Sequence, residues 1–184
     1  MANFVSNEGF IVCEEFTAST PSILAEENKS VTFEAILQEA NHPNRNKRIY
    51  GKDVLMEALA AKNLQEKLLN KAFYGEAGHP LSEDIKRQAY IDQSRISHIV
   101  TNFKWDGDLL RGIVETAQTS MGYDMKGLLR QGSKLSFSMR GLGNIVKPEG
   151  DYKRVLSPMM IIAYDWVKLI FKFFSYLEYT IIYK

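Results

Sequence analysis

Residues 134–144, KLSFSMRGLGN, place two serines and an arginine beside a pair of glycines. Side chains on a strand repeat every two residues, so Ser136 and Ser138 are expected to point to the same face. A serine becomes a nucleophile when a base removes its proton, an acid orients that base, and backbone N–H groups hold the oxyanion. The stretch is therefore either a strand end with a glycine turn or a nucleophile beside an amide pocket.

Three histidines are candidates for the base. His79 lies in GEAGHP, where two glycines and a proline restrict the backbone and leave the ring at a strand end. Because histidine titrates near neutrality, this ring suits a general base, with a structural role as the alternative. His42 lies in a polar loop, where we expect a solvated ring. His98 lies within a strand, where a structural role is expected.

Asp165, in IIAYDWV, is a carboxylate within an otherwise apolar run. An unpaired charge is costly to bury, so Asp165 is either the acid of a site or the partner of a buried arginine or lysine. The oxyanion donors are expected in Arg140-Gly141-Leu142-Gly143. This stretch is predicted to form a flexible turn whose amides point inward beside a cation.

A zinc site is the rival chemistry, and it requires three or four converging nitrogen, oxygen or sulfur ligands. The sequence contains no HxxxH, CxxC or HExxH motif and has one cysteine, Cys13. A zinc hydrolase would need His79, His98 and a carboxylate to converge. We therefore expect neither a metal nor another cofactor.

The composition limits the kind of fold that positions these side chains. The 184 residues suffice for one domain with a sizeable core, and 45% hydrophobic with 24% charged residues is typical of a globular protein. The formal net charge of +1 gives no electrostatic reason to expect a nucleic-acid partner. A single cysteine forms no internal disulfide and fits a reducing intracellular compartment.

The apolar periodicity predicts a chain rich in strands with two or three helices. Strands are expected over 9–17, 30–38, 96–103, 109–116 and 155–167, within 72–84 and in the 134–144 stretch, and helices over 52–71 and 121–130. Asp106-Gly107 predicts a hairpin turn, Gly132 is expected to end the second helix, and 147–151 (KPEGD) is expected to be a loop. This order favours an α+β fold or a barrel decorated with helices.

The C-terminal segment is apolar but interrupted by charges. Between 159 and 183 it carries Asp165, Lys168, Lys172 and Glu178. Because central charges are costly in a span of about 20 residues, we expect no transmembrane helix but a buried strand followed by an amphipathic helix. We expect one domain over 1–167 and an apolar tail of undetermined role over 168–184.

Several motifs, taken in order, resemble the prohead (capsid maturation) serine proteases of tailed phages, and the T-even type most of all. They are NRNKRIYG, GEAGHP, SRISHIV and the run WDGDLLRGIVETAQTSMGYDMKGLLRQGSKLSFSMRGLGN. The resemblance covers residues 30–167 and depends on the order and spacing of the motifs together. In fold the family resembles the herpesvirus assemblins, which implies an α+β structure with a small, mostly antiparallel β-barrel and surrounding helices.

The resemblance implies a serine endopeptidase that cleaves scaffold and capsid proteins, and itself, during prohead maturation. It implies His79 as the general base and Ser138 as the nucleophile. Arg140, Gly141 and Gly143 are the implied oxyanion-side loop.

The third member of the site is less directly implied. Asp165 is favoured, because related phage enzymes carry an acidic residue at about the matching place. His98 is the alternative third member, since it lies in a matching family segment. Ser136 is the alternative nucleophile, because an alignment shift of two residues would exchange it with Ser138.

The implied partners are the phage scaffold and major capsid proteins as substrates. A homo-oligomer is left open, and neither nucleic acid nor membrane is expected. The implied location is the host cytoplasm, inside the immature capsid. The alternative function is a catalytically degenerate scaffold or capsid-assembly protein that uses the apolar C-terminal segment as its interface. The enzyme requires His79 Nε2 within hydrogen-bonding reach of a serine hydroxyl, which distinguishes the two.

Overall fold

The computed structural model describes residues 10–15, 19–27, 29–81, 84–143 and 146–167. Its strands are β1 (Phe10–Glu15), β2 (Ser22–Glu26), β3 (Val31–Glu39), β4 (Arg48–Tyr50), β5 (Tyr74–Glu76), β6 (Ile96–Asp106), β7 (Leu109–Thr116), β8 (Ser136–Gly143), β9 (Val146–Glu149), β10 (Tyr152–Val155) and β11 (Met159–Val167). Its helices are α1 (Lys52–Ala60), α2 (Lys62–Leu69), α3 (Ile85–Ala89) and α4 (Ser120–Arg130), with a short 3-10 turn, η1 (Gln93–Arg95).

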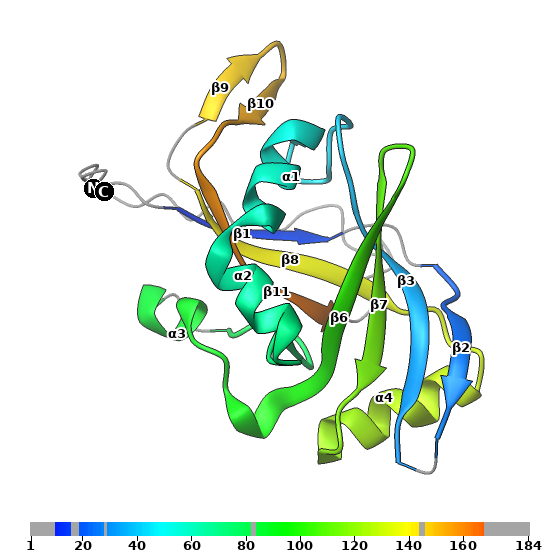
Figure 1. Ribbon diagram of the computed structural model, residues 1–184. Helices are drawn as coiled ribbons and strands as arrows, with labels where there is room; N and C mark the ends of the chain where they lie inside the picture. The colour runs from blue at the N-terminus through cyan, green and yellow to red at the C-terminus, as the bar shows by residue number, and fades with distance from the viewer. Residues whose placement is uncertain (1–9, 16–18, 28, 82–83, 144–145, 168–184) are drawn as a thin grey trace.

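The strands form three sheets with the orders β1-β8-β11, β4-β10-β9 and β2-β3-β7-β6-β5 (Figure 1). All strand pairs among the described residues are antiparallel except β4 with β10. The predicted α+β class with mostly antiparallel strands is confirmed. The barrel is not a closed ring of ladders in this part of the chain. Instead, the chain at the edges of the five-stranded sheet is joined to the β1-β8-β11 sheet by single bridges, Ala77 with Trp166 and Ser19 with Leu135.

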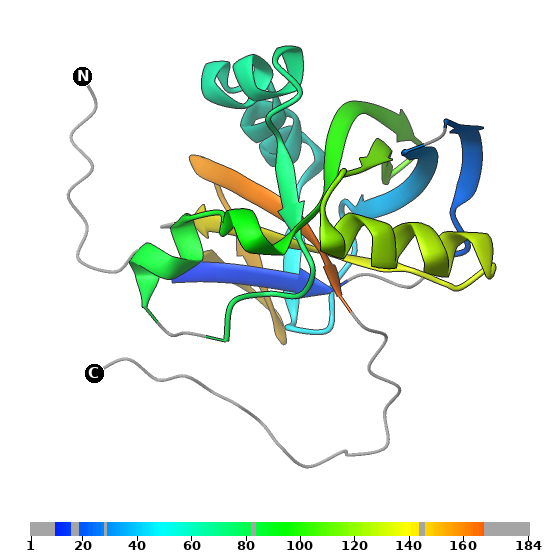
Figure 2. The same ribbon diagram turned by 90° about the horizontal axis from the view of Figure 1, so that it is seen from below.

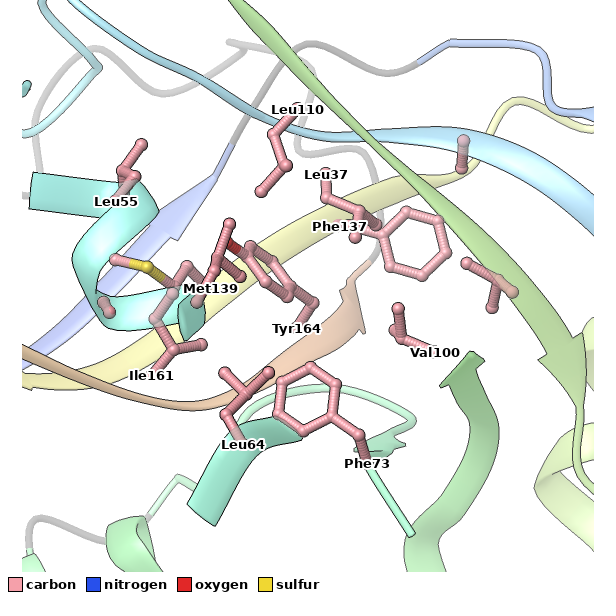
Figure 3. Close-up of a cluster of buried hydrophobic side chains, with 14 of the residues drawn as sticks. Leu37, Leu55, Leu64, Phe73, Val100, Leu110, Phe137, Met139, Ile161 and Tyr164 are labelled. Carbon is pink, nitrogen blue, oxygen red and sulfur yellow. The ribbon is translucent and has the colours of Figure 1, made fainter. Parts of the chain in front are cut away.

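The hydrophobic core lies between these sheets and under α1 and α2 (Figure 3). Phe137 of β8 packs against Phe33 of β3 with ring centroids 6.3 Å apart. Tyr164 of β11 meets Phe73 edge-on at 6.4 Å. Each large side chain buried in this way contributes about 1.5–3 kcal/mol to stability. The strand that carries the two serines is therefore anchored by the apolar side chains that alternate with them, Phe137 and Met139.

Strand β8 is buried on both faces. Phe137 and Met139 face the core, while Ser136, Ser138 and Arg140 share the opposite face and are also buried. Figure 1 shows β8 running across the molecule between β1 and β11. The face of β8 that points away from the core is thus also covered by other parts of the protein.

The expected turn at 140–143 is wrong, because β8 continues to Gly143. Arg140 pairs with Cys13 of β1 and with Ala163 of β11, and Gly141 pairs with Val12 and Ile161. Glycine is locally typical of turns, but two long-range ladders hold this stretch extended. A Cβ at Gly141 would lie 2.9 Å from the carbonyl oxygen of Met160, so close packing between strands accounts for the glycine.

The expected helix over 52–71 is divided at Ala61, whose φ of −57° and ψ of 133° are not helical. Leu59 and Leu64 are both buried, yet five positions on one helix rotate a side chain by about 140°. The break allows both leucines to face the core. In Figure 2 the two helices lie at the top, apart from α4, which packs on β6 and β7.

Two expected turns are confirmed and one expected loop is wrong. The β6–β7 hairpin turns at Gly107 with φ +59°, and Gly132 follows α4 with φ +71°. The KPEGD segment is part of a hairpin in which β9 and β10 pair around Gly150.

None of the helices in the described ranges has the length and apolar character of a membrane span. The tail over 168–184 lies outside the described residues, so its amphipathic helix and the domain division at 167 remain predictions.

Candidate active site

Ser138 lies near the middle of the sheet formed by β1, β8 and β11. It is paired with Asp165 on β11 and with Glu15 on β1. Both Ser138 and Asp165 are buried, at 2% and 0% exposure. Because residues directly opposite on antiparallel strands hold their side chains on one face, the ladder places this hydroxyl and carboxylate on the same face.

His79 reaches the same place from the chain that follows β5. Ala77 forms a bridge with Trp166, the residue after Asp165, and Gly78 N–H donates to the Trp166 carbonyl oxygen at 2.7 Å. Gly78 has φ +80°, a conformation that favours glycine, and it turns the chain so that His79 comes next. The second glycine of GEAGHP, Gly78, therefore directs the histidine toward β11.

The imidazole of His79 lies between the two buried side chains. Its Nε2 is 2.6 Å from Ser138 Oγ, and its Nδ1 is 2.8 Å from Asp165 Oδ2. An ionised carboxylate only accepts, so Nδ1 carries the hydrogen and Nε2 keeps a lone pair for the serine O–H. The His79 side chain is 20% exposed, so the ring has contact with solvent while the acid behind it has none.

Asp165 is a buried carboxylate with several compensating partners. Burial raises the pKa of this carboxyl, but the hydrogen bond from His79, the Arg140 charge, the His79 charge and the Glu76 N–H hold that pKa below its ordinary value. The backbone N–H of Glu76 is 2.9 Å from Asp165 Oδ1. Asp165 thus has both a hydrogen bond with His79 and an ion pair with Arg140.

Arg140, Gly141 and Gly143 do not form a loop beside the serine. Their backbone lies in strand β8, which is paired with β1 on one side and with β11 on the other. The Arg140 guanidinium is fully buried and lies 3.0 Å from Asp165 Oδ2 through Nε. The structure therefore places this cation behind the acid, and the expected oxyanion-side loop at 140–143 is absent from the described chain.

The two alternative residues lie elsewhere. Ser136 is buried on the same face as Ser138, but its Oγ has no hydrogen-bond partner in the described part of the protein. The His98 Nε2 donates to the Tyr164 carbonyl oxygen at 2.8 Å, and its Nδ1 is 2.9 Å from Ser97 Oγ. Neither side chain has a hydrogen bond to His79 in the described residues.

His98 has the environment of a structural histidine. Burial lowers the pKa of His98 to about 4, against only partly opposing effects of the Asp165 charge and the Tyr164 carbonyl. A Cβ at Gly75 would lie 2.3 Å from this ring, so the neighbouring strand packs closely on it. Its imidazole is a neutral hydrogen-bonding group within the sheet.

The zinc alternative finds no suitable ligand set in the ranges that the structure describes. These ranges hold no group of three or more histidine, cysteine, aspartate or glutamate side chains placed to bind a metal ion. His42, the third histidine, is exposed and lies 3.9 Å from both Glu39 and Asp108.

Sequence reasoning missed the buried carboxylate of Glu76. Its side chain is fully buried and is bonded by Arg87 and Arg140. The one signal for it in the sequence is an acidic residue inside GEAGHP, next to a glycine at a predicted strand end. Without its arginine partners, which come from distant segments, that signal had no interpretation.

The chain is similar to proteins of phage capsid assembly. The family described as prohead core protein serine protease matches residues 13–162. The prohead core protein protease of Enterobacteria phage T4 is 29% identical over 125 residues, which are 67% of this chain and 56% of that protein. The structure of the bacteriophage T4 capsid assembly protease, gp21, matches with a TM-score of 0.71 at 23% identity, and covers 88% of this chain and 99% of that chain.

These similarities bear on different parts of the molecule. The structural likeness shows the fold and agrees with the predicted architecture. The family range includes His79 and Ser138 and ends three residues before Asp165. The chain spans a little over half the length of the curated relative that it matches.

Proposed function

We propose that this chain, which belongs to the family of prohead core protein serine proteases, is a serine endopeptidase of capsid maturation. The observation that carries the proposal is the row Asp165–His79–Ser138, with contacts of 2.8 and 2.6 Å. Three side chains from β11, the segment after β5, and β8 meet in the order that nucleophilic catalysis requires.

In this mechanism Ser138 Oγ attacks the scissile carbonyl while His79 Nε2 takes the hydroxyl proton. Asp165 accepts from Nδ1–H, keeps the ring in the required tautomer and stabilises the imidazolium that forms. His79 then gives the proton to the leaving amine. Water completes the cycle by hydrolysing the acyl-enzyme with His79 acting again as base.

The substrates we propose are the scaffold and major capsid proteins of a phage, and the chain itself. Support comes from the T4 proteins to which the chain is similar, since one is named a prohead core protein protease and the other a capsid assembly protease. We infer that cleavage takes place inside the immature capsid in the host cytoplasm. An extended substrate segment fits such a strand-rich enzyme by adding to an exposed sheet edge.

The experiment that tests this proposal is labelling of the purified full chain with a fluorophosphonate, followed by mapping of the modified residue. We expect the label on Ser138 and no label in Ser138→Ala. Ser136→Ala is the matched comparison, because it makes the same change two residues away on the same face of β8. Labelling of Ser136, or no labelling of the folded wild-type chain, would overturn the proposal and favour a non-enzymatic capsid-assembly role.

A further inference from the structure

A cluster of charged side chains lies behind the His79–Asp165 pair. Its members are Glu76 of β5, Arg87 of α3, Arg95 of η1, Arg140 of β8 and Asp165 of β11. The Glu76, Arg140 and Asp165 side chains have no exposed surface. Buried ion pairs are often no more stabilising than apolar side chains of similar volume. Stability alone therefore does not account for three buried ions directly behind a catalytic row.

Glu76 connects this cluster to the segment that contains α3. Its Oε1 accepts from Arg140 Nη2 at 3.1 Å, from Arg87 Nη1 at 3.1 Å and from Asp92 N–H at 3.0 Å. Its Oε2 accepts from Arg87 Nη2 at 2.7 Å. The backbone N–H of the same residue donates to Asp165 Oδ1 at 2.9 Å. One residue thus contacts α3 with its side chain and the acid with its backbone.

Arg140 is fixed from two directions. Its Nη1 donates to the carbonyl oxygens of Gln88 and Tyr90 at 3.0 and 3.2 Å. Its Nη2 donates to Glu76 Oε1 at 3.1 Å and to Asp165 Oδ1 at 3.2 Å, and its Nε lies 3.0 Å from Asp165 Oδ2. Since Arg140 and Ser138 are two residues apart on one strand, the nucleophile and this cation share a rigid support.

Each oxygen of the Asp165 carboxylate therefore has two neighbours. Oδ1 meets the Glu76 N–H and Arg140 Nη2, and Oδ2 meets His79 Nδ1 and Arg140 Nε. Arg140 Nη2 hydrogen-bonds Oδ1, while Arg140 Nε is a charged neighbour of Oδ2 without a hydrogen bond to it. Rotation of the carboxylate would therefore break the hydrogen bonds from Glu76 N–H and Arg140 at Oδ1 and the contact with His79 at Oδ2. We propose that Arg140 and Glu76 are positioning residues that hold Asp165 in the orientation from which it orients His79. This inference rests on the proposed serine protease function.

The cluster also sets the charge around the His79–Asp165 pair. The charged and titratable groups around this pair come from five elements: Arg140 from β8, Glu76 from β5, Arg87 from α3, Arg95 from η1 and the neutral His98 from β6. On β1, Glu15 occupies the register position opposite Ser138. A nearby cation opposes proton uptake by the pair, and a nearby anion favours it. Loss of the Arg140 charge is therefore expected to move proton uptake to higher pH, and loss of the Glu76 charge to lower pH.

The test measures how fast a fluorophosphonate labels Ser138 in the full chain as a function of pH and reagent concentration. Arg140→Met is expected to lower the maximal labelling rate about 10- to 100-fold and to leave the half-saturating reagent concentration unchanged. The acid limb of its profile, the range in which the labelling rate falls as the pH is lowered, is expected at higher pH than in the wild type. Arg140→Lys keeps the charge without the planar fork, so it lowers the rate and leaves the acid limb in place. Glu76→Gln lowers the rate and moves the acid limb to lower pH.

Arg154→Met is the matched control, because Arg154 pairs with Glu149 on the β9–β10 hairpin, and it is expected to label like the wild type. The inference would be overturned if all three cluster variants were labelled at the wild-type rate. It would also be overturned if the acid limbs of Arg140→Met and Glu76→Gln moved in the same direction. In both cases labelling of Ser138 would leave the proposed function standing. If Arg140→Met does not fold by circular dichroism, Arg140→Lys and Glu76→Gln decide the question. An unlabelled wild-type chain overturns function and inference together.

Discussion

Ser138 and Asp165 are direct cross-strand partners in the β8–β11 ladder, and the His79 ring joins their side chains. Two members of the site are thus placed by one strand register, and the third is placed by the bridge between Ala77 and Trp166. A shift of one residue in that register would send the two side chains to opposite faces. The site therefore depends on the pairing of the sheet more than on any loop.

Asp165→Asn tests the role of the acid. Asparagine keeps the shape of the side chain but cannot hold a negative charge, and its amide favours the wrong imidazole tautomer. We expect labelling of Ser138 by a fluorophosphonate to slow about 10³- to 10⁴-fold. Asp151→Asn, in the exposed turn between β9 and β10, is the control for the same chemical change. Wild-type labelling in a folded Asp165→Asn chain would remove Asp165 from the mechanism.

Gly78→Ala tests the turn that carries His79. Both Gly78 and Gly107 have positive φ, at +80° and +59°, so alanine at either position is expected to cost about 1–2 kcal/mol in the free energy of unfolding. Only Gly78 precedes the histidine and bonds to β11. Urea unfolding should therefore show similar losses in the two variants, while the labelling rate of Ser138 falls in Gly78→Ala alone. Equal labelling rates would show that the turn does not position the ring.

Local patterns were sufficient to single out the three side chains that meet in the candidate site. GEAGHP restricts the backbone around one histidine, the alternation of 134–139 points two serines to one face, and the apolar run around Asp165 makes its charge conspicuous. The hairpin at Gly107 and the end of α4 at Gly132 were also predictable from local sequence, because glycine is the residue that most readily adopts the positive φ found at both positions.

Features that depend on distant partners were not predictable in this way. The Arg140-Gly141-Leu142-Gly143 stretch has the composition of a turn, and only its pairing with Cys13 on one side and Ala163 on the other shows that it is a strand. Glu76 was missed because its arginine partners come from other elements. A periodic pattern describes one segment at a time, whereas buried charges are compensated across segments.

Two glycines of α4 give opposite expectations for stability. A Cβ at Gly122 would lie 1.9 Å from the carbonyl oxygen of Ala117, whereas a Cβ at Gly127 would meet nothing within 4 Å. Gly127→Ala is therefore expected to stabilise the protein by about 0.5–1 kcal/mol, since alanine restricts the unfolded chain and favours the helix. Gly122→Ala should destabilise it by about 1–3 kcal/mol through overpacking. Thermal unfolding of the two variants should shift in opposite directions, and a shared direction would contradict the expected packing.

His98 is expected to make stability depend on pH. Its pKa is lowered from 6.5 to about 4 by burial, so between these values the unfolded chain binds a proton that the folded chain does not. The His98 contribution is complete above about pH 6.5 and is lost as the pH falls toward 4, by up to about 3 kcal/mol.

The comparison that isolates this effect is His98→Gln, since glutamine keeps an N–H for the Tyr164 carbonyl oxygen but does not titrate. Urea unfolding of both chains is measured from about pH 7 down to about pH 4.5. The other ionisable groups are common to both chains, so their contributions cancel in the difference between the two free energies of unfolding. That difference should shift in favour of the glutamine variant as the pH falls. A difference that stays constant across this range would mean that His98 binds its proton equally well in the folded and unfolded protein.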